Sequence, residues 1–486
     1  MLYNGTQWRD TSGQPIHAHG GGLLQSGDYY YWFGENRQGR KRVSCYRSNN
    51  LKDWEFRGDV LTLDSPHRPI DVRTAPELVT DAATGRGANI ERPKVIYHAP
   101  ANRYVMWMHW ENGSDYSAAR CAVASCDTVD GEYTYHGSFN PCGFMSRDCT
   151  LFVDDDGTAY FISAARENAD LHMYRLSDDY LSIDEHVRTL WPGQYREAPA
   201  VMKRNGVYFM VSSGCTGWEP NQGKYAYSDN LTGNWSQLYD LGGPTTYDTQ
   251  PTFILPVSRE GETRYLYVGD RWDPSDYHSS SYVFLPLRFP DDKSMKLEWT
   301  DAVSVLSEET SNVPSSERGG FSRILNRSHR YLAAVSGDDS ESPAVGESQA
   351  DTVTAGKLAY GSAAQHWIIE NLEDGAVQIR NKHNGKYLDA DDVAEAETDS
   401  DSDSDSDADM CLTVRLREAS GRSTQQWTLV DDAEHSGWCS ILHRATGLAL
   451  TINRDYDGAL HLMPLASHEL RRSQGFAVTP HYGVRV

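Results

Sequence analysis

The sequence has little cysteine, a shortage of basic side chains and no long apolar stretch. Eight Cys in 486 residues are far too few for a disulfide scaffold, and their spacings form no metal-binding pattern. No apolar run approaches the roughly 18 residues that a membrane-spanning helix needs. The 69 acidic and 45 basic side chains give a net charge of −24, which disfavours nucleic acid and anionic membranes as partners.

The N-terminus lacks the basic segment and apolar core of a signal peptide, so we expect a soluble protein that is cytoplasmic unless an export signal was removed. The length predicts two or three domains. Eleven acidic side chains fall between Asp389 and Asp409, where no Lys or Arg occurs. They repel one another, and the segment has no glycine to shape a Ca²⁺-binding loop. It therefore predicts a disordered acidic insertion at about 390–410.

Helical periodicity is scarce, whereas aromatic residues and glycine are abundant: 13 Trp, 28 Tyr, 12 Phe and 40 Gly. Strand-like runs repeatedly follow turn signals, for example Ser26-Gly27 and Asn205-Gly206. Aromatic rings are common in sheets, and they also stack on the apolar faces of sugars. The composition predicts an all-β protein of short strands, with sugar binding as a second reason for some of the aromatic residues.

Five repeating units fill residues 1–306. Their starts are marked by Gly20, Glu91, Asp148, Glu197 and Gln250, and the last four marks lie about 50 residues apart. A propeller blade of four antiparallel strands produces a period of this length. The first domain is therefore predicted to be a five-bladed β-propeller.

A different repeat follows a polar linker at residues 307–320. Its marks are Gln365-His-Trp367, Gln425-Gln-Trp427 and the degenerate Gln474-Gly-Phe476. Three such units predict a β-trefoil over residues 321–486, which resembles the ricin-type lectin modules attached to many glycosidases. Those modules usually place an Asp after a turn that ends in Leu. Asp389 is the one such residue in the three units, so at most one sugar-binding pocket is expected.

The residues that start the propeller units are the best candidates for chemistry, because the innermost strands of the blades surround a central cavity. Glu91, Asp148, Glu197 and Gln250 place three carboxyl groups and one amide at equivalent positions. A single acid facing the funnel would be explained by solvation of the tunnel. Four polar residues in register favour a functional site.

Residues 1 to about 305 resemble the family 43 glycoside hydrolases. The segment from Asp148 to the Asp156-Gly157 turn is similar to that family's third-blade motif, and Arg196-Glu-Ala-Pro199 to its fourth-blade motif. The resemblance implies an inverting mechanism. In it, Glu197 protonates the leaving glycosidic oxygen, and Asp148 raises the pKa of this acid and orients it. An inverting enzyme also needs a base about 6.5–9.5 Å from the acid to activate water.

The sequence departs from most of the family where the base is expected, near the start of the first blade. The segment Ile16-His-Ala-His-Gly-Gly-Gly-Leu23 contains no carboxylate. This absence resembles the exo-β-1,3-galactanase subgroup, in which a second-blade Glu and a fifth-blade Gln line the −1 subsite. The resemblance implies that Glu91 binds galactose hydroxyls. It also implies that Gln250 holds the attacking water, as an amide or as its imidic-acid tautomer.

His17 and His19 alternate on the first inner strand and therefore share a face. Two such side chains could bind a metal, but a zinc site needs further ligands. We expect them to line the funnel in the space left by the missing Asp. No metal and no cofactor are predicted.

Several loop residues follow inner strands, where substrate hydroxyls would be recognised. They are Glu35, Tyr116, Asn168 and Thr216, and Trp218 is a candidate stacking platform. For each of them an ordinary loop role is the alternative.

Together these features predict an inverting, exo-acting galactan 1,3-β-galactosidase that removes galactose from the β-1,3-galactan of arabinogalactan, with polysaccharide or oligosaccharide as its partner. One alternative has the same chemistry: an α-L-arabinofuranosidase or β-xylosidase, which a conventional base Asp would have favoured. The other alternative is a non-catalytic carbohydrate-binding protein in which both domains bind sugar.

Overall fold

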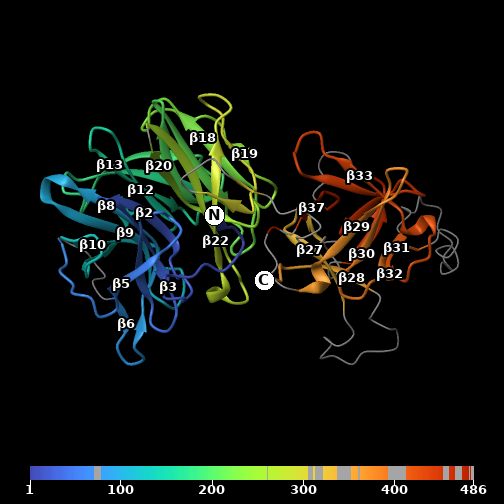
Figure 1. Ribbon diagram of the computed structural model, residues 1–486, viewed down its shortest axis with the longest axis horizontal. Coiled ribbons are helices and arrows are strands. Elements are labelled where there is room, and N and C mark those ends of the chain that lie inside the picture. The colour runs from blue at the N-terminus through green and yellow to red at the C-terminus, as the bar shows by residue number, and fades with distance from the viewer. Residues whose placement is uncertain are drawn as a thin grey trace. The chain divides into compact units, whose positions relative to one another are not determined.

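The computed structural model describes residues 1–70, 78–259, 261–304, 310–311, 321–335, 352–359, 362–391, 412–452, 459–465, 473–480 and 482. The chain divides into two compact units, residues 1–312 and 313–485 (Figure 1). The predicted linker lies almost wholly outside the described residues, and so does the acidic insertion from residue 392 onward. No helix in the described part is long and apolar enough to cross a membrane.

Strands make up nearly all of the regular structure. The helical elements are short 3₁₀ turns at Ala99–Ala101, Pro141–Gly143, Tyr277–Ser279, Ala363–Gln365 and Ser423–Gln425. Two small sheets join β1 (Leu2–Tyr3), β24 (Ala302–Val303) and β25 (Thr310–Ser311), and β6 (Val79–Asp81) with β7 (Arg86–Gly87). The all-β fold class predicted from composition is confirmed.

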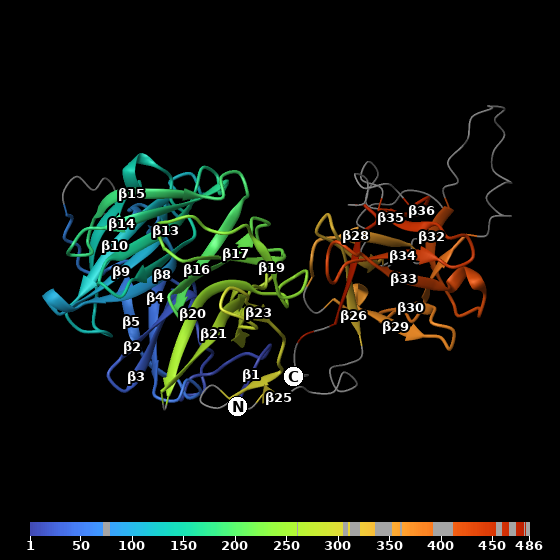
Figure 2. The same ribbon diagram turned by 90° about the horizontal axis from the view of Figure 1, so that it is seen from above.

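The first unit is a five-bladed β-propeller, as the repeat predicted, and each blade is a four-stranded antiparallel sheet (Figure 2). Blade 1 holds β2 (His19–Ser26), β3 (Tyr29–Asn36), β4 (Arg42–Ser48) and β5 (Glu55–Thr62). Blade 2 holds β8 (Asn89–His98), β9 (Arg103–Glu111), β10 (Arg120–Cys126) and β11 (Thr134–Phe139). Blade 3 holds β12 (Cys149–Val153), β13 (Ala159–Ala165), β14 (Asp170–Leu176) and β15 (Ile183–Leu190). Blade 4 holds β16 (Arg196–Arg204), β17 (Val207–Gly214), β18 (Gly223–Ser228) and β19 (Tyr239–Leu241), and blade 5 holds β20 (Gln250–Arg259), β21 (Glu262–Arg271), β22 (Ser281–Arg288) and β23 (Lys296–Leu297).

Aromatic side chains fill the spaces between neighbouring blades. Trp107 of blade 2 packs on Phe161 of blade 3, with ring centroids 5.0 Å apart. Trp32 of blade 1 meets Tyr282 of blade 5 edge-on at 4.7 Å. These rings are fully or almost fully buried, so they contribute to the core and are unavailable to sugar.

The propeller is closed by contacts between its first and last blades. The innermost strands β2, β8, β12, β16 and β20 contact one another in this order, and β20 contacts β2. The Tyr282 hydroxyl donates to the Ile16 carbonyl at 3.0 Å and accepts from the Ala18 N–H at 2.8 Å. The Asn4 side chain exchanges two hydrogen bonds with the Phe284 backbone, at 3.0 and 2.9 Å. The N-terminal segment thus fixes blade 1 against blade 5.

The innermost strands are irregular where they approach the propeller axis. In β2, β8 and β16 the pairing register shifts directly after His19, Glu91 and Glu197. The residues that follow, Gly20, Arg92 and Ala198, have φ angles of +59°, +54° and +51°. A bulge bends the strand and redirects its side chains. A non-glycine residue in this left-handed region costs about 1–3 kcal/mol and occurs mainly at functional sites.

The second unit is a β-trefoil, as predicted. Its strands are β26 (Ser322–Asn326), β27 (Arg330–Ala334), β28 (Val353–Gly356), β29 (Trp367–Asn371), β30 (Val377–Asn381), β31 (Tyr387–Ala390), β32 (Leu412–Arg417), β33 (Trp427–Asp431), β34 (Cys439–His443), β35 (Ala449–Ile452), β36 (Leu460–Met463) and β37 (Phe476–Pro480). The aromatic residues of the three repeats, Trp367, Trp427 and Phe476, are fully buried in one core. The two indole N–H groups donate to the carbonyls of Leu332 and Leu388, at 2.9 and 3.0 Å. The repeat therefore marks the trefoil scaffold.

Candidate functional site

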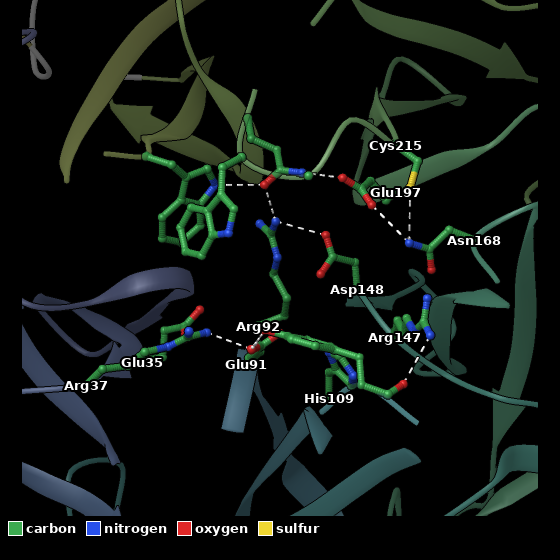
Figure 3. Close-up of a pocket in the computed structure, with 15 residues that line it drawn as sticks. Glu35, Arg37, Glu91, Arg92, His109, Arg147, Asp148, Asn168, Glu197 and Cys215 are labelled. Atoms are coloured by element: carbon green, nitrogen blue, oxygen red, sulfur yellow. Dashed lines mark hydrogen bonds and ion pairs between the residues drawn. The ribbon is translucent and has the colours of Figure 1, made fainter. Parts of the chain in front are cut away.

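Glu91, Asp148, Glu197 and Gln250 line one cavity of about 290 Å³ near the starts of the inner strands (Figure 3). The other lining residues are Glu35, Arg37, Arg92, His109, Tyr116, Arg147, Asn168, Cys215, Gly217, Trp218 and Trp272. All five blades contribute to this set. The structure thus brings together the four polar residues that the sequence placed at equivalent positions.

Glu197 is a buried carboxyl group held from two sides. Its Oε2 accepts a hydrogen bond from Asn168 Nδ2 at 3.1 Å, and its Oε1 accepts one from Gln250 Nε2 at 3.0 Å. Burial and the nearby charge of Asp148 raise the pKa of Glu197 to about 7, against the opposing effect of Arg92. The side chain can therefore carry a proton near neutral pH, which a general acid must do.

The Gln250 amide uses all of its hydrogen-bonding capacity. Its Oε1 accepts from Arg92 Nη2 at 2.5 Å and from Trp272 Nε1 at 2.8 Å, while its Nε2 donates to Glu197 and to Ser213 Oγ, each at 3.0 Å. Guanidinium and indole N–H groups can only donate, so the atom that faces them is the carbonyl oxygen. In the imidic-acid tautomer the oxygen would carry a hydrogen, and this O–H donor would face two other donors, which is unfavourable. The resting site therefore selects the amide form.

Glu197 and Gln250 share the cavity, but they do not face each other across a sugar-sized gap. The distance from Glu197 Oε1 to Gln250 Nε2 is 3.0 Å, whereas the acid and base of an inverting glycosidase are about 6.5–9.5 Å apart. The two side chains therefore do not lie on opposite sides of a sugar-sized space. They are direct partners because the amide N–H finds its acceptor in the carboxyl group.

Arg92 connects the acid side of the cavity with the fifth blade. Its Nη2 lies 2.9 Å from Asp148 Oδ2 and also donates to Gln250, and its Nη1 donates to the Pro251 carbonyl at 3.1 Å. The side chain is buried and starts from the bulge of β8. One guanidinium thus fixes the orientation of both a carboxylate and an amide (Figure 3).

Glu91 is surrounded by donors. Its Oε1 accepts from Arg37 Nη2 and from the Tyr116 hydroxyl, each at 2.6 Å, and its Oε2 lies 3.2 Å from His109 Nδ1. Burial alone would raise the pKa of Glu91, but His109, Arg37 and Tyr116 outweigh it and hold the pKa well below its ordinary value. Glu91 is therefore a fixed carboxylate.

Glu35 and Arg92 lie beside Gly20, in the segment where blade 1 has no carboxylate. A Cβ added to Gly20 would lie 3.0 Å from Glu35 Oε1 and 3.3 Å from Arg92 Cδ. Glu35 Oε2 accepts from Arg37 Nε at 2.8 Å, and Oε1 has no hydrogen bond to a described residue. Burial raises the pKa of Glu35 to about 7; Arg37 opposes this shift and Glu91 adds to it. The glycine keeps space open for a carboxyl group from the neighbouring strand.

His17 and His19 do not line the cavity, which corrects the expectation that they fill this space. The His19 ring stacks on Tyr282 at 4.9 Å, meets Tyr277 edge-on at 4.9 Å, and lies 3.4 Å from Asp270 through Nδ1. Burial lowers the pKa of His17 to about 4, so its ring is neutral. The two histidines pack between blades 1 and 5 because the aromatic residues of blade 5 hold them there.

Four of the five predicted loop residues line the cavity: Glu35, Tyr116, Asn168 and Trp218. Thr216 does not. Its hydroxyl donates to the Glu219 carbonyl at 2.5 Å and accepts from Asn221 Nδ2 at 2.7 Å. These bonds stabilise the loop conformation, and the Thr216 hydroxyl uses its hydrogen bonds within the loop.

Asn168 and Trp218 offer the kinds of group that bind sugars. Asn168 Oδ1 is buried and has no hydrogen-bond partner among the described residues. It lies in a turn where residues 166–168 all have positive φ. The Trp218 ring is 42% exposed and meets Trp272 edge-on at 5.5 Å. Trp272 in turn stacks on Tyr277. The cavity therefore has an aromatic wall and an unused buried acceptor.

Seven lining residues were not predicted from the sequence: Arg37, Arg92, His109, Arg147, Cys215, Gly217 and Trp272. Buried carboxylates need partners, so Arg37 and Arg92, which stand beside predicted acids, could have been found by charge balance. His109 is a polar residue within a strand-like run, which is a weaker signal. Trp272 and Cys215 directly follow the second strands of their blades, where no sequence pattern marks them.

Glu91, His109 and Asp148 could each offer a metal ligand, since one atom from each lies within 4.8 Å of the others; no other such group occurs in the described part of the chain. Their charges are already balanced, however. Arg37 pairs with Glu91, and Arg92 pairs with Asp148. The carboxylates of Glu111 and Glu91 raise the pKa of His109 to about 9 against the effect of burial, so its ring is a cation. The trio is therefore explained as a salt-bridge network.

In the trefoil, Asp389 lies on β31 and is buried. Its Oδ2 accepts from Gln425 Nε2 at 2.8 Å, and the equivalent Thr451 Oγ1 accepts from Gln474 Nε2 at 3.0 Å. In the second and third repeats, the glutamine thus reaches toward the residue that follows the turn's Leu. In the first repeat that residue is Ala333, which offers no acceptor.

Comparison with known proteins gives matches for both units. Residues 22–250 match the glycosyl hydrolases family 43, and residues 312–402 and 363–460 match the ricin-type β-trefoil lectin domain-like family. No curated protein matches the chain.

Three solved structures are similar. An exo-β-1,3-galactanase from Clostridium thermocellum is 38% identical, with 99% of each chain covered and a TM-score of 0.59. A GH43 β-1,3-galactosidase with galactodeoxynojirimycin is 33% identical, covering 62% of this chain and 100% of that chain, with a TM-score of 0.55. A variant of the Phanerochaete chrysosporium exo-β-1,3-galactanase with β-1,3-galactotriose is 30% identical, covering 80% of this chain and 82% of that chain, with a TM-score of 0.56.

Proposed function

Because the chain belongs to glycoside hydrolase family 43, we propose that it is an inverting exo-β-1,3-galactanase, a galactan 1,3-β-galactosidase acting on arabinogalactan. The observation that carries this proposal is the buried Glu197 carboxyl group, which is tuned to hold a proton and lies in one cavity with Asp148 and Gln250. The similarity to exo-β-1,3-galactanases and to a β-1,3-galactosidase supports this substrate.

Glu197 donates its proton to the leaving glycosidic oxygen. Asp148 keeps that proton on Glu197 by its charge, and its ion pair with Arg92 holds it in place. Positive charge develops on the sugar in the transition state. The ionised Glu91 and Asp148 favour that charge, and Glu91 also accepts hydrogen bonds from galactose hydroxyls.

Gln250 positions the attacking water. When the leaving oxygen takes its place at Glu197, it displaces the Gln250 N–H, which is then free to hold the water oxygen. A neutral amide is a poor proton acceptor, so the proton lost by the water needs a carboxylate. Glu35 is the pocket carboxyl group suited to take it, because its Oε1 accepts no hydrogen bond from a described residue and it lies across the pocket from Glu197 (Figure 3).

The size of the cavity supports exo action. About 290 Å³ is at the small end of the range for ligand sites, and suits one terminal sugar better than a length of chain. The aromatic wall of Trp218 and Trp272 provides an apolar surface for a sugar ring. In the trefoil, Asp389 provides one position for polysaccharide binding.

The test is the product released from β-1,3-galactobiose, measured by proton NMR in the first minutes of reaction. The proposal expects α-galactose, the inverted anomer, and little release from aryl α-L-arabinofuranoside or β-xyloside. β-1,4-Galactobiose serves as a control with the same sugars. An initial excess of β-galactose over the anomeric mixture that the reducing-end unit supplies would contradict inversion, and preference for the aryl pentosides would contradict the substrate. A carbohydrate-binding protein without catalysis would release no sugar from any of them.

A further inference from the structure

Within blade 2, two further buried ionisable side chains lie next to Glu91. His109 Nδ1 lies 3.2 Å from Glu91 Oε2, and His109 Nε2 lies 2.9 Å from Glu111 Oε1. His109 and Glu111 both lie on β9 and are almost completely buried. Neither takes part in the proposed proton transfers, yet an imidazole between two buried carboxylates needs an explanation.

The second carboxylate holds the loop that carries Tyr116. Glu111 Oε2 accepts from the backbone N–H groups of Ala118 and Ala119, each at 3.0 Å. Ala119 has a φ of +42°, a strained conformation for a residue with a Cβ. Two bonds from one buried carboxylate hold this strained backbone in place. From the same loop, the Tyr116 hydroxyl reaches back to Glu91 at 2.6 Å.

The contacts therefore form a closed circuit: Glu91, His109, Glu111, the loop backbone, Tyr116 and again Glu91. The geometry points to His109 and Glu111 as positioning residues that keep Glu91 ionised and hold Tyr116 against it. This inference rests on the proposed role of Glu91 in binding galactose. In this inference, residues of blade 2 keep Glu91, the carboxylate that binds sugar, in its ionised form.

The charge balance supports this role. Burial alone would lower the pKa of His109, but Glu111 and Glu91 raise it to about 9, so the ring is a cation at neutral pH. The other ionisable groups near Glu91 are Arg37, Tyr116 and Lys41, which also favour its charge, and Glu35 and Asp148, which oppose it. Without the imidazolium, Glu91 and Glu111 would be two neighbouring buried carboxylates, and Arg37 would pair with Glu91 alone. Buried acids in that position take up protons.

The experiment compares full-length His109→Asn with wild type on β-1,3-galactobiose between pH 4.5 and 8. His136→Asn is the matched control, because His136 is a buried, hydrogen-bonded histidine of the same blade that does not line the cavity. As pH falls from 7 to 5, kcat/KM of His109→Asn should drop about tenfold more than that of wild type, because Glu91 becomes protonated. His136→Asn should lower the melting temperature without changing the shape of the pH profile.

A second measurement separates a charge effect from a general loss of structure. Galactose binding, followed by the fluorescence of the pocket tryptophans, should weaken in His109→Asn at pH 5 and recover toward the wild-type value at pH 7.5. At pH 5 the variant should approach Glu91→Gln, which mimics a protonated Glu91 at every pH. If His109→Asn folds and both of its pH profiles are parallel to those of wild type, the inference is wrong. If wild type itself releases no galactose, the proposed function fails, whatever the variants do.

Discussion

The propeller and the trefoil are both built from repeats of short strands, but they use their equivalent positions differently. In the propeller, the inner strands of different blades converge on an axis, so Glu91, Asp148, Glu197 and Gln250 meet in one cavity. In the trefoil, the equivalent residues Ala333, Asp389 and Thr451 lie on three different strands, β27, β31 and β35.

This difference explains how each unit can change in evolution. A propeller site needs different chemistry from each blade, because an acid, a charge neighbour and an amide must cooperate around one sugar. A trefoil position acts with its own repeat, because its glutamine partner comes from that repeat: Gln425 for Asp389 and Gln474 for Thr451. Losing one trefoil position therefore leaves the others intact, whereas losing one propeller position disables the whole site.

The largest effect is expected from Glu197→Gln. The amide cannot donate a proton to the glycosidic oxygen, so kcat on β-1,3-galactobiose should fall by about 10³-fold. Galactose affinity, measured by calorimetry, should remain nearly unchanged. Glu132→Gln, which replaces an exposed acid in blade 2, is the control and should keep full activity. A Glu197→Gln enzyme with near wild-type turnover would show that the acid has been misassigned.

A smaller effect is expected from Asp148→Asn, and it tests whether blades cooperate through charge. In wild type, kcat/KM should decline as pH rises through about 7, because Glu197 loses its proton there. Removing the Asp148 charge takes away one cause of the raised pKa and leaves Arg92 unopposed, so the decline should begin at lower pH.

The pH dependence of kcat/KM for Asp148→Asn measures this shift. Asp155→Asn, an exposed acid on the same blade, is the control and should leave the profile in place. An unchanged alkaline limb in Asp148→Asn would mean that Asp148 does not set the charge state of Glu197. A limb that moves to higher pH would contradict the sign of the interaction.

The smallest effect on catalysis is expected from the trefoil. Asp389→Asn should abolish retardation of the protein in a β-1,3-galactan affinity gel while kcat/KM on β-1,3-galactobiose stays the same. Thr451→Asp should add retardation, because the new carboxylate can accept from Gln474 as Asp389 accepts from Gln425. Loss of disaccharide activity in Asp389→Asn would contradict the independence of the two units. Equal retardation of all three proteins would remove Asp389 as a binding position.

The sequence predicted the architecture because repetition is visible along the chain. The recurring turn glycines and the spacing of Glu91, Asp148, Glu197 and Gln250 alone predict five blades. The same periodicity correctly brought these four residues to one cavity. The Gln-x-Trp repeats indicated the trefoil for the same reason.

The contacts around the cavity could not be predicted in this way, because they depend on backbone irregularities and on loops. Direct pairing of Glu197 with Gln250 arises where β16 and β20 meet, and no spacing encodes the 3.0 Å distance. Glu35 fills the space beside Gly20 because that residue has no Cβ. His19 was expected at the funnel, but the aromatic residues of blade 5 retain it between the blades.

The left-handed backbone conformations in the inner strands would have to be reproduced if this site were built into another protein. Suppose that the acid, the amide and their charged neighbours were copied onto a propeller with regular inner strands. Their side chains would then follow the regular alternation of each strand and would not converge on one cavity. A transplant would need the irregular backbone at Gly20, Arg92 and Ala198 as well as the functional groups. In this protein the irregular main chain is needed to position the side chains of the site.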